Sequence, residues 1–334
     1  MPAQRAVVMH DPRHESHGFP LSERFPALAT VPRTTLCILP SPVQRVTVNG
    51  AELWIKVDGS NAAICGGNKV RALEFLLAGL KPGEIVLTTG GEGSTHVLAT
   101  AVHARRLGAS VIGVRWRHEM NHSAYRVADM IAEECVISRV YPGTMGALIR
   151  AQLMRMTQKV RYVPVGGSTP LGILAHVNAA LELARQVRAG ELPAPSRVVV
   201  PLGTGGTAAG LALGFAIAGL DTATIAVQVT PAIVANGFRI RRLITQTVNL
   251  IERYTGERMP RVSEHLLGIV HDAYGGAYGR PLPAAQDAAR ALQRVTDIRL
   301  DDTYSAKAFV VALSLAHSAK GPTLFWDTFD SRLV

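Results

Sequence analysis

Apolar residues recur along the chain at the two spacings that are typical of strands and helices. The runs VQRVTV and ELWIKV are separated by Asn49-Gly50. An Asn-Gly pair between two apolar runs is a strong signal for the turn of a β-hairpin. The apolar positions that follow have the period of an amphipathic helix, and they are Val70, Leu73, Leu76, Leu77 and Leu80.

From residue 85 to residue 230 the two patterns alternate. Short apolar runs predict strands over residues 85–88, 111–115, 136–141, 162–165, 197–202 and 224–230. Helix-period segments between them predict helices over residues 96–107, 145–157, 171–188 and 207–219. Strands that alternate with helices form βαβ units and a parallel sheet. The sequence therefore predicts an α/β fold of the doubly wound kind.

The composition agrees with large aliphatic cores. Hydrophobic residues make up 48%, charged residues 18% and aromatic residues 5% of the 334 residues, which argues against disorder. Parallel sheets that helices bury on both faces need such aliphatic strands. At roughly 100–200 residues per domain, the length predicts two domains. The first 30 residues are polar and carry Pro12, Pro20 and Pro26, so we expect them to form an arm rather than a core element.

The net charge of +10 raises the question of a nucleic-acid or membrane partner. The basic residues are scattered, as in Arg105-Arg106, Arg239 and Arg280, and no nucleic-acid motif is present. We interpret the charge as a solvated basic surface that also tolerates an anionic cofactor and substrate. The most apolar run, from Ala208 to Leu220, is too short to cross a bilayer, which takes about 20 residues. The sequence favours neither nucleic acid nor membrane as a partner.

The three cysteines, Cys37, Cys65 and Cys135, have no metal-ligand spacing. We interpret them as free thiols of a reducing compartment and expect no metal site. The N-terminus has no apolar segment of the kind found in signal peptides. We therefore expect a cytoplasmic protein.

Three turns that follow predicted strands are rich in glycine and small polar residues. In open α/β sheets, ligands bind at such turns, beyond the carboxyl ends of the strands. The turn Gly203-Thr204-Gly205-Gly206-Thr207 is the clearest, because backbone N–H groups and the positive end of a helix would meet there as an anion site. It matches neither a P-loop nor GxGxxG, and one such turn alone could equally be a tight structural turn. The other two turns are Gly90–Thr95 and Gly166–Thr169.

A second candidate for chemistry is Lys69, in CGGNKVRALEFL. A lysine at the start of a helix is electrostatically unfavourable, because the helix dipole is positive there. A solvated surface lysine is the commoner interpretation of such a residue. In a polar pocket, however, its pKa can fall, and the amine can then bond covalently to a carbonyl carbon.

These segments together resemble the pyridoxal-phosphate family that includes 1-aminocyclopropane-1-carboxylate deaminase and D-cysteine desulfhydrase. The resemblance extends from about Ser41 to Thr328 through seven blocks in the family's order. They are GGNKVRALEFLLA, TTGGEGSTH, VPVGGSTPLGILAHVNAALELA, PLGTGGTAAGL, GGAYGRP, LDDTYSAKA and GPTLFWDT.

The resemblance implies a tryptophan-synthase-β-like fold with two doubly wound parallel-sheet domains, known as fold type II, and a homodimer. A small domain of residues 70–175 would be inserted into a large cofactor-binding domain of residues 1–69 and 176–334. Pyridoxal 5'-phosphate would lie between the two domains.

The resemblance also implies roles for individual residues. Lys69 would hold the cofactor covalently and move the α-proton of the substrate. Ser94 would meet the substrate carboxylate and act in acid–base or nucleophilic chemistry. Tyr278 and Tyr304 match two active-site tyrosines, although half-buried packing is the ordinary role of such residues.

The implied contacts divide into two sets. The cofactor would contact Lys69, Asn68, Thr95, Gly203, Thr204, Gly205, Gly206, Thr207 and Ser305. The substrate would contact Ser94, Thr95, His96 and Thr328. Ser305 would face the pyridine nitrogen, and a neutral hydroxyl there makes the ring a weaker electron sink than a carboxylate would.

Four positions depart from the family pattern. Thr95 stands where the family commonly has an asparagine that contacts the phenolic oxygen of the cofactor. Ala72 stands where a second lysine often lies near the phosphate. Asp327 and Phe329 replace the histidine and glycine of a His-Thr-Gly pattern.

The leading functional hypothesis is a pyridoxal-phosphate-dependent lyase or deaminase that acts on a small amino acid by α-proton abstraction and β-elimination. Deaminases of the cyclopropane amino acid tend to have glutamate at the Ser305 position and a larger apolar residue at the Thr328 position, so the two small hydroxyl residues favour a D-cysteine desulfhydrase-like activity. The alternatives are 1-aminocyclopropane-1-carboxylate deamination, racemisation, β-replacement, and a cofactor-binding protein without turnover.

Overall fold

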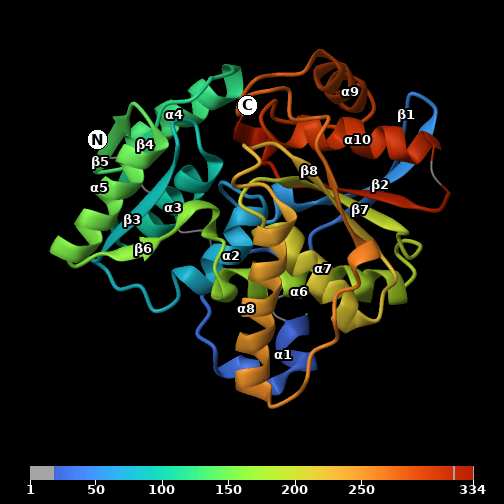
Figure 1. The fold of residues 1–334 in the computed structure, drawn as a ribbon, viewed down its shortest axis with the longest axis horizontal. Helices are drawn as coiled ribbons and strands as arrows, with labels where there is room; N and C mark the ends of the chain where they lie inside the picture. The colour runs from blue at the N-terminus through green and yellow to red at the C-terminus, as the bar shows by residue number, and fades with distance from the viewer. Residues whose placement is uncertain (1–18, 319, 334) are drawn as a thin grey trace, which may run out of the picture.

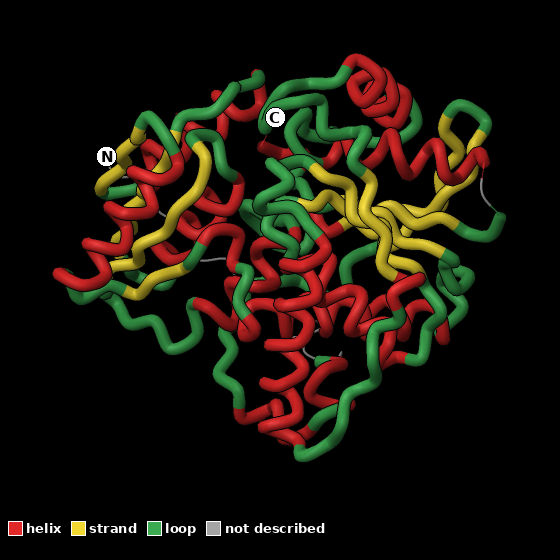
Figure 2. The backbone as a smooth tube through the Cα atoms, viewed as in Figure 1, coloured by secondary structure: helices red, strands yellow, loops and turns green. Residues whose placement is uncertain are grey.

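The computed structural model describes residues 19–318 and 320–333, and it contains two sheets that lie side by side (Figure 1). The N-terminal residues 1–18, which include Pro12 of the predicted arm, lie outside the described part of the chain. Helices cover both faces of the larger sheet, as Figure 2 shows in red and yellow. The doubly wound α/β fold predicted from the sequence is confirmed.

The larger sheet has the strand order β1-β2-β10-β7-β8-β9. β1 and β2 form the predicted antiparallel hairpin, in which Val48 pairs with Ala51 across the Asn-Gly turn. The pairs β2–β10, β10–β7, β7–β8 and β8–β9 are parallel. The strands are β1 (Val43–Val48), β2 (Ala51–Val57), β7 (Arg197–Leu202), β8 (Ala223–Gln228), β9 (Leu267–Val270) and β10 (Thr323–Asp327).

The smaller sheet is entirely parallel and has the strand order β5-β4-β3-β6. Its strands are β3 (Ile85–Gly91), β4 (Ser110–Trp116), β5 (Ile137–Tyr141) and β6 (Arg161–Val163). β3 is longer than the predicted 85–88, because Thr89, Gly90 and Gly91 continue the pairing with β4.

Ten α-helices surround the two sheets in the described part of the chain. They are α1 (Pro20–Arg24), α2 (Asn68–Leu76), α3 (Thr95–Arg106), α4 (His122–Glu134), α5 (Thr144–Thr157), α6 (Pro170–Arg188), α7 (Gly206–Ala218), α8 (Gly237–Thr255), α9 (Pro283–Gln293) and α10 (Ser305–Ser318). Short 3-10 turns occupy η2 (Pro26–Thr30), η3 (Asp58–Ser60), η4 (Val165–Gly167), η5 (Glu264–Leu266) and η6 (Ser331–Leu333). None of the helices in the described residues is long and apolar enough to cross a membrane.

Each sheet supplies side chains to two cores, because successive residues of a strand point to opposite faces. Val198 and Val200 of β7 pack with α6, α7 and α8, whereas Val199 packs with α9 and α10. In the smaller sheet, Val86 packs with α3 and α4, and Leu87 packs with α5. These aliphatic strands, buried on both faces, agree with the low aromatic content.

The expectation that the first 30 residues form an arm is wrong for the part that the structure describes. Leu21, Phe25 and Leu28 are at most 3% exposed and belong to the core around α6 and α7. Pro20 and Pro26 each begin a short helical segment rather than disrupting one, as proline can at the first helical position. The apolar residues recur at a spacing of four and three, which places them on one side of the segment.

Several elements have no counterpart among the sequence predictions. α4 has few buried apolar positions, mainly Val127 and Ile131, and was not predicted. Beyond residue 230 the sequence predictions stop, and the structure adds α8, β9, α9, α10 and β10. The sequence does carry a pattern that predicts α8, because Ile240, Leu243 and Ile244 have helical spacing. In the structure these three residues face the core.

A buried group of charged side chains joins α2 to the larger sheet. Arg71 donates to Asp58 at 2.7 Å and to Glu182 at 2.9 Å, and Lys56 Nζ lies 2.6 Å from the Glu182 carboxylate. Burial by itself would raise the pKa of Glu182, but Arg71 and Lys56 lower it to about 2. Removing one partner of a buried pair leaves an uncompensated charge. The group therefore holds the start of α2, where Lys69 lies.

Candidate functional site

Two of the three glycine-rich turns are in direct contact. The Ser168 hydroxyl lies 2.6 Å from the Thr204 hydroxyl. A Cβ on Gly166 would lie 2.3 Å from Thr204 Oγ1, and one on Gly206 would lie 2.6 Å from Ser168 Oγ. The turns after β6 and β7 therefore need glycine at these positions for close packing. The third glycine-rich turn, Gly90–Thr95, lies near them as well. His96, the residue that follows it, has its Cε1 3.8 Å from the position of a Cβ on Gly167.

A narrow cavity of about 30 Å³ lies where these turns meet the start of α2. Six of its residues are predicted site residues, and three others, Pro201, Asp301 and Phe329, were not predicted. The predicted ones are Asn68, Lys69, Thr95, Gly203, Tyr304 and Thr328.

Lys69 is the second residue of α2 and is half-buried. The helix begins after Gly67, whose φ of +108° is favourable only for glycine. A Cβ there would also lie 2.6 Å from the Thr328 carbonyl oxygen. Burial lowers the pKa of Lys69 to about 8, and the Asp301 carboxylate opposes that shift. The amine is thus available in its neutral, nucleophilic form near neutral pH.

The lowered pKa predicts how Lys69 reacts as the pH changes. In the cofactor-free protein, reductive methylation of Lys69 by formaldehyde should accelerate as pH rises through about 8, the point at which the amine loses its proton. Peptide mass spectrometry over pH 6–10 measures this, with exposed Lys81 as the internal reference. The free energy of unfolding should also rise between pH 8 and 10.5, because only the unfolded chain keeps that proton. Parallel profiles for both lysines would contradict the prediction.

The turn after β7 has the geometry of an anion site. Gly205 has a φ of +91° and is the N-cap of α7, so the N–H groups of the first turn of α7 point to the end of the helix. Asn68 Nδ2 donates to Thr207 Oγ1 at 2.8 Å. This bond joins the residue before Lys69 to the turn. The two motifs singled out in the sequence, the lysine and the glycine-rich turn, therefore lie next to each other.

Tyr278 and Tyr304 form a hydrogen-bonded pair through their hydroxyl groups. Their rings are 5.7 Å apart at 73°, and the His118 ring lies 4.5 Å from the Tyr278 ring. Burial raises the pKa of Tyr278 to about 12 and raises that of Tyr304 well above its ordinary value. Both hydroxyls keep their protons at neutral pH. A Cβ on Gly91 would lie 3.1 Å from Tyr278 Cε1, so this pair covers the first glycine-rich turn.

Ser305 and Asp301 lie at the start of α10. The Asp301 carboxylate accepts hydrogen bonds from the backbone N–H groups of Thr303, Tyr304 and Ser305, with N···O distances of 2.8–3.0 Å. Burial nevertheless raises the pKa of Asp301. The Ser305 hydroxyl is fully buried and has no hydrogen bond of normal geometry in the described chain, although it lies close enough to the Asp301 carboxylate to help lower the pKa of that group. A buried hydroxyl without a full hydrogen bond is costly, and this one is free to bond a ligand atom.

Sequence reasoning missed Asp301, although the sequence carried a signal for it. An aspartate shortly before an apolar helical run is a typical helix cap. The sequence indicates Asp327 only as a departure from the family pattern. Its side chain is fully buried at the end of β10, Oδ2 has no partner in the described residues, and burial raises its pKa well above the ordinary value.

Ser94 and His96 lie beside the cavity described above but are not among its lining residues. Ser94 is the N-cap residue of α3 and is 5% exposed. His96 is buried, with Nε2 3.3 Å from Thr88 Oγ1. Burial, followed by the charge of Lys69, lowers the pKa of His96 to about 3, so it is neutral. Their predicted contacts with substrate remain predictions.

The chain is similar in sequence and in fold to known proteins. Residues 32–325 match the family described as pyridoxal-phosphate dependent enzymes. The chain is 33% identical to nocardicin C-9' epimerase of Nocardia uniformis subsp. tsuyamanensis, over 91% of this chain and 94% of that protein. It is 28% identical to D-cysteine desulfhydrase of Salmonella paratyphi A, over 90% and 94% respectively. A solved structure of an ACC deaminase homologue matches with a TM-score of 0.76 and 26% identity, over 92% of this chain and 94% of that one.

Proposed function

Because the chain belongs to the pyridoxal-phosphate dependent enzymes, we propose that it is a lyase or deaminase that removes a β-substituent from a small amino acid. The observation that carries this proposal is the neutral Ser305 hydroxyl, which is fully buried at the start of α10 beside Asp301 and has no hydrogen bond of normal geometry in the described chain. By the resemblance it would meet the pyridine nitrogen. A neutral partner there suits a substrate whose good leaving group departs soon after the α-proton is lost.

The residues of the site fit the cofactor by their chemistry. The N–H groups from Gly203 to Thr207 and the N-terminus of α7 would hold the phosphate. The Lys69 amine would hold the aldehyde carbon, and its neighbour Asn68 is already bonded to Thr207. When bound, the cofactor supplies the electron sink that makes the α-hydrogen of an amino acid acidic.

The protein's own groups would then manage the protons and the substrate. The Lys69 amine, with its pKa near 8, can take a proton from the α-carbon as a general base near neutral pH. Tyr304 lines the cavity, and its hydroxyl keeps its proton, so it can donate a hydrogen bond to a departing group. Ser94 and Thr95 at the start of α3 would bind the substrate carboxylate, since N–H groups and the helix dipole favour an anion there.

Release of a 2-oxo acid tests the proposed elimination. We expect measurable turnover of D-cysteine or β-chloro-D-alanine, and little or none of 1-aminocyclopropane-1-carboxylate. Ser305 and Thr328 carry this expectation, because neither is the carboxylate or larger apolar residue expected of the cyclopropane deaminases. Faster turnover of the cyclopropane substrate would refute it.

Tyr304→Phe should slow elimination by about 10²–10⁴-fold if its hydroxyl transfers a proton.

A second candidate function is epimerisation at the α-carbon. The match to nocardicin C-9' epimerase favours it, because such a reaction also begins with loss of the α-proton. The Lys69 amine and the protonated Tyr278–Tyr304 pair are two groups able to carry a proton. Deuterium exchange at the α-carbon in D2O, with inversion and without release of a 2-oxo acid, would identify this activity.

We further propose a homodimer and a cytoplasmic location. The dimer is supported by the family resemblance and by an exposed apolar row on α5, formed by Met145, Ile149, Leu153 and Met156. Sedimentation velocity tests it. The cytoplasmic location is supported by Cys37, Cys65 and Cys135, which are buried free thiols in the structure.

A further inference from the structure

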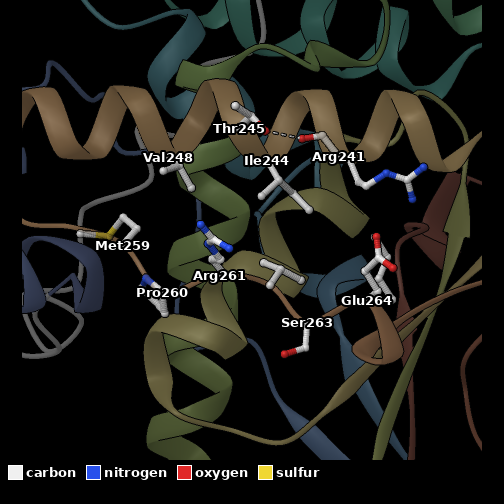
Figure 3. A pocket seen from close by; sticks show the side chains of 11 residues that line it. Arg241, Ile244, Thr245, Val248, Met259, Pro260, Arg261, Ser263 and Glu264 are labelled. Atoms are coloured by element: carbon white, nitrogen blue, oxygen red, sulfur yellow. Dashed lines mark hydrogen bonds between the residues drawn. The ribbon is translucent and has the colours of Figure 1, made fainter.

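A second and larger cavity lies away from Lys69, between α8 and the segment of residues 259–267 (Figure 3). It has a volume of about 320 Å³, which falls within the usual range for small-molecule sites. None of the residues that line it belongs to the cofactor site described above.

The floor of this cavity is apolar and continuous with the main core. Ile244 is 9% exposed, and Val248, Met259, Val262 and Leu267 pack against the same hydrophobic cluster. A methionine in such a wall adapts easily to the shape of a ligand. The cavity would therefore accept the apolar body of a small molecule.

The charged groups of the cavity are separated into two ends. Figure 3 shows the Arg261 side chain pointing toward the face of α8 that carries Val248 and Ile244. At the other end, the Glu264 side chain points toward the Arg241 side of α8. Arg261 has no carboxylate partner among the described residues. One end of the cavity thus has a solvent-exposed guanidinium, without an ion-pair partner among the described residues, beside an apolar floor.

We propose that this cavity binds a small organic anion, with Arg261 contacting its carboxylate, phosphate or sulfonate group and Ile244, Val248 and Met259 contacting its apolar body. A planar guanidinium can hold two oxygens of such an anion at once. The site is distinct from the proposed reaction and does not depend on its substrate.

The helix that forms one wall of this cavity also touches the cofactor turn. Arg239 Nε donates to the Thr204 carbonyl at 2.9 Å. A Cβ on Gly205 would lie 3.3 Å from Ile240 Cγ1 and 3.6 Å from Leu243 Cδ1. A ligand that shifts α8 would therefore shift the turn, and the two ligands would change each other's affinity by the same factor.

Equilibrium dialysis of the holoenzyme with 8-anilinonaphthalene-1-sulfonate, an apolar molecule with one sulfonate, tests the site. We expect one saturable site per chain. Arg261→Ala should weaken binding about tenfold, through loss of a charge-assisted contact. Val248→Trp should abolish binding by filling the cavity, while the absorbance of the bound cofactor shows that the variant is folded. Arg253→Ala removes an exposed charge from the same helix outside the cavity and should leave the affinity unchanged.

Any one of the following results would overturn the site: no saturable binding up to millimolar probe, equal losses in Arg261→Ala and Arg253→Ala, or unchanged binding in Val248→Trp. Affinity that falls as protein concentration rises would also overturn it, because a second copy of the chain would then cover the cavity. The coupling has its own test. Removal of pyridoxal phosphate should change the affinity for the probe at least threefold, and an unchanged affinity would refute the link through α8.

Discussion

Replacement of Lys69 by alanine is expected to lower turnover by about 10²–10⁴-fold or more, because the group that moves the α-proton is lost. The protein should also lose its covalent link to pyridoxal phosphate. In the parent protein we expect a yellow solution whose visible band disappears on reduction with borohydride. Peptide mapping after reduction should place the pyridoxyl group on Lys69.

The reason lies in the surroundings of this one amine. Lys69 lines the cavity, its pKa is lowered to about 8, and Asn68 joins it to the glycine-rich turn after β7. Lys81→Ala is the matched control, since that lysine is exposed shortly after the same helix and should keep both turnover and label. A pyridoxyl group on any other lysine would refute the site assignment.

Replacement of Gly205 by valine is expected to weaken binding of pyridoxal phosphate by about 10–100-fold, equivalent to about 1.4–2.8 kcal/mol. Gly205 has a φ of +91°, which a β-branched residue adopts only with strain. A Cβ there would also press on Ile240 at 3.3 Å. Both effects move the N–H groups that would hold the phosphate.

The opposite end of α7 offers a matched control. Gly219 also has a positive φ, +69°, but a Cβ there would meet no atom within 4 Å. Gly219→Val should therefore strain the backbone as Gly205→Val does, while leaving the cofactor affinity close to that of the parent. Titration of the cofactor-free variants with pyridoxal phosphate, followed by absorbance, compares the two. Equal affinities in Gly205→Val and Gly219→Val would mean that the turn is only structural.

Gly206→Val tests the next position, where the new side chain would collide with Ser168.

Local sequence was sufficient to find the parts of the candidate site. Lys69 could be found because a lysine after two glycines and an asparagine, at the start of a helix, is an unusual local arrangement. The turn from Gly203 to Thr207 could be found because a strand, a glycine run and a helix follow one another. The resemblance of ordered segments then indicated the family, which the match over residues 32–325 confirms.

Other features depend on contacts between distant segments, and local sequence did not predict them. Asp301 and Phe329 line the cavity beside Lys69 only because β10 and α10 return to the centre of the molecule. The buried pair of Arg71 with Glu182 joins residues 111 positions apart. The cavity at Arg261 exists only because α8 lies beside the segment of residues 259–267.

By itself, the sequence determined the alternation of strands and helices, the buried faces of the strands, and the two motifs of the candidate site. These follow from side-chain periodicity and from the backbone freedom of glycine, which act within a few residues. The tertiary structure decided which groups meet and therefore the direction of the pKa shifts of Lys69, Asp301 and Asp327. A pKa responds to burial and to charges from every neighbouring segment, and the local sequence around a residue does not contain that information.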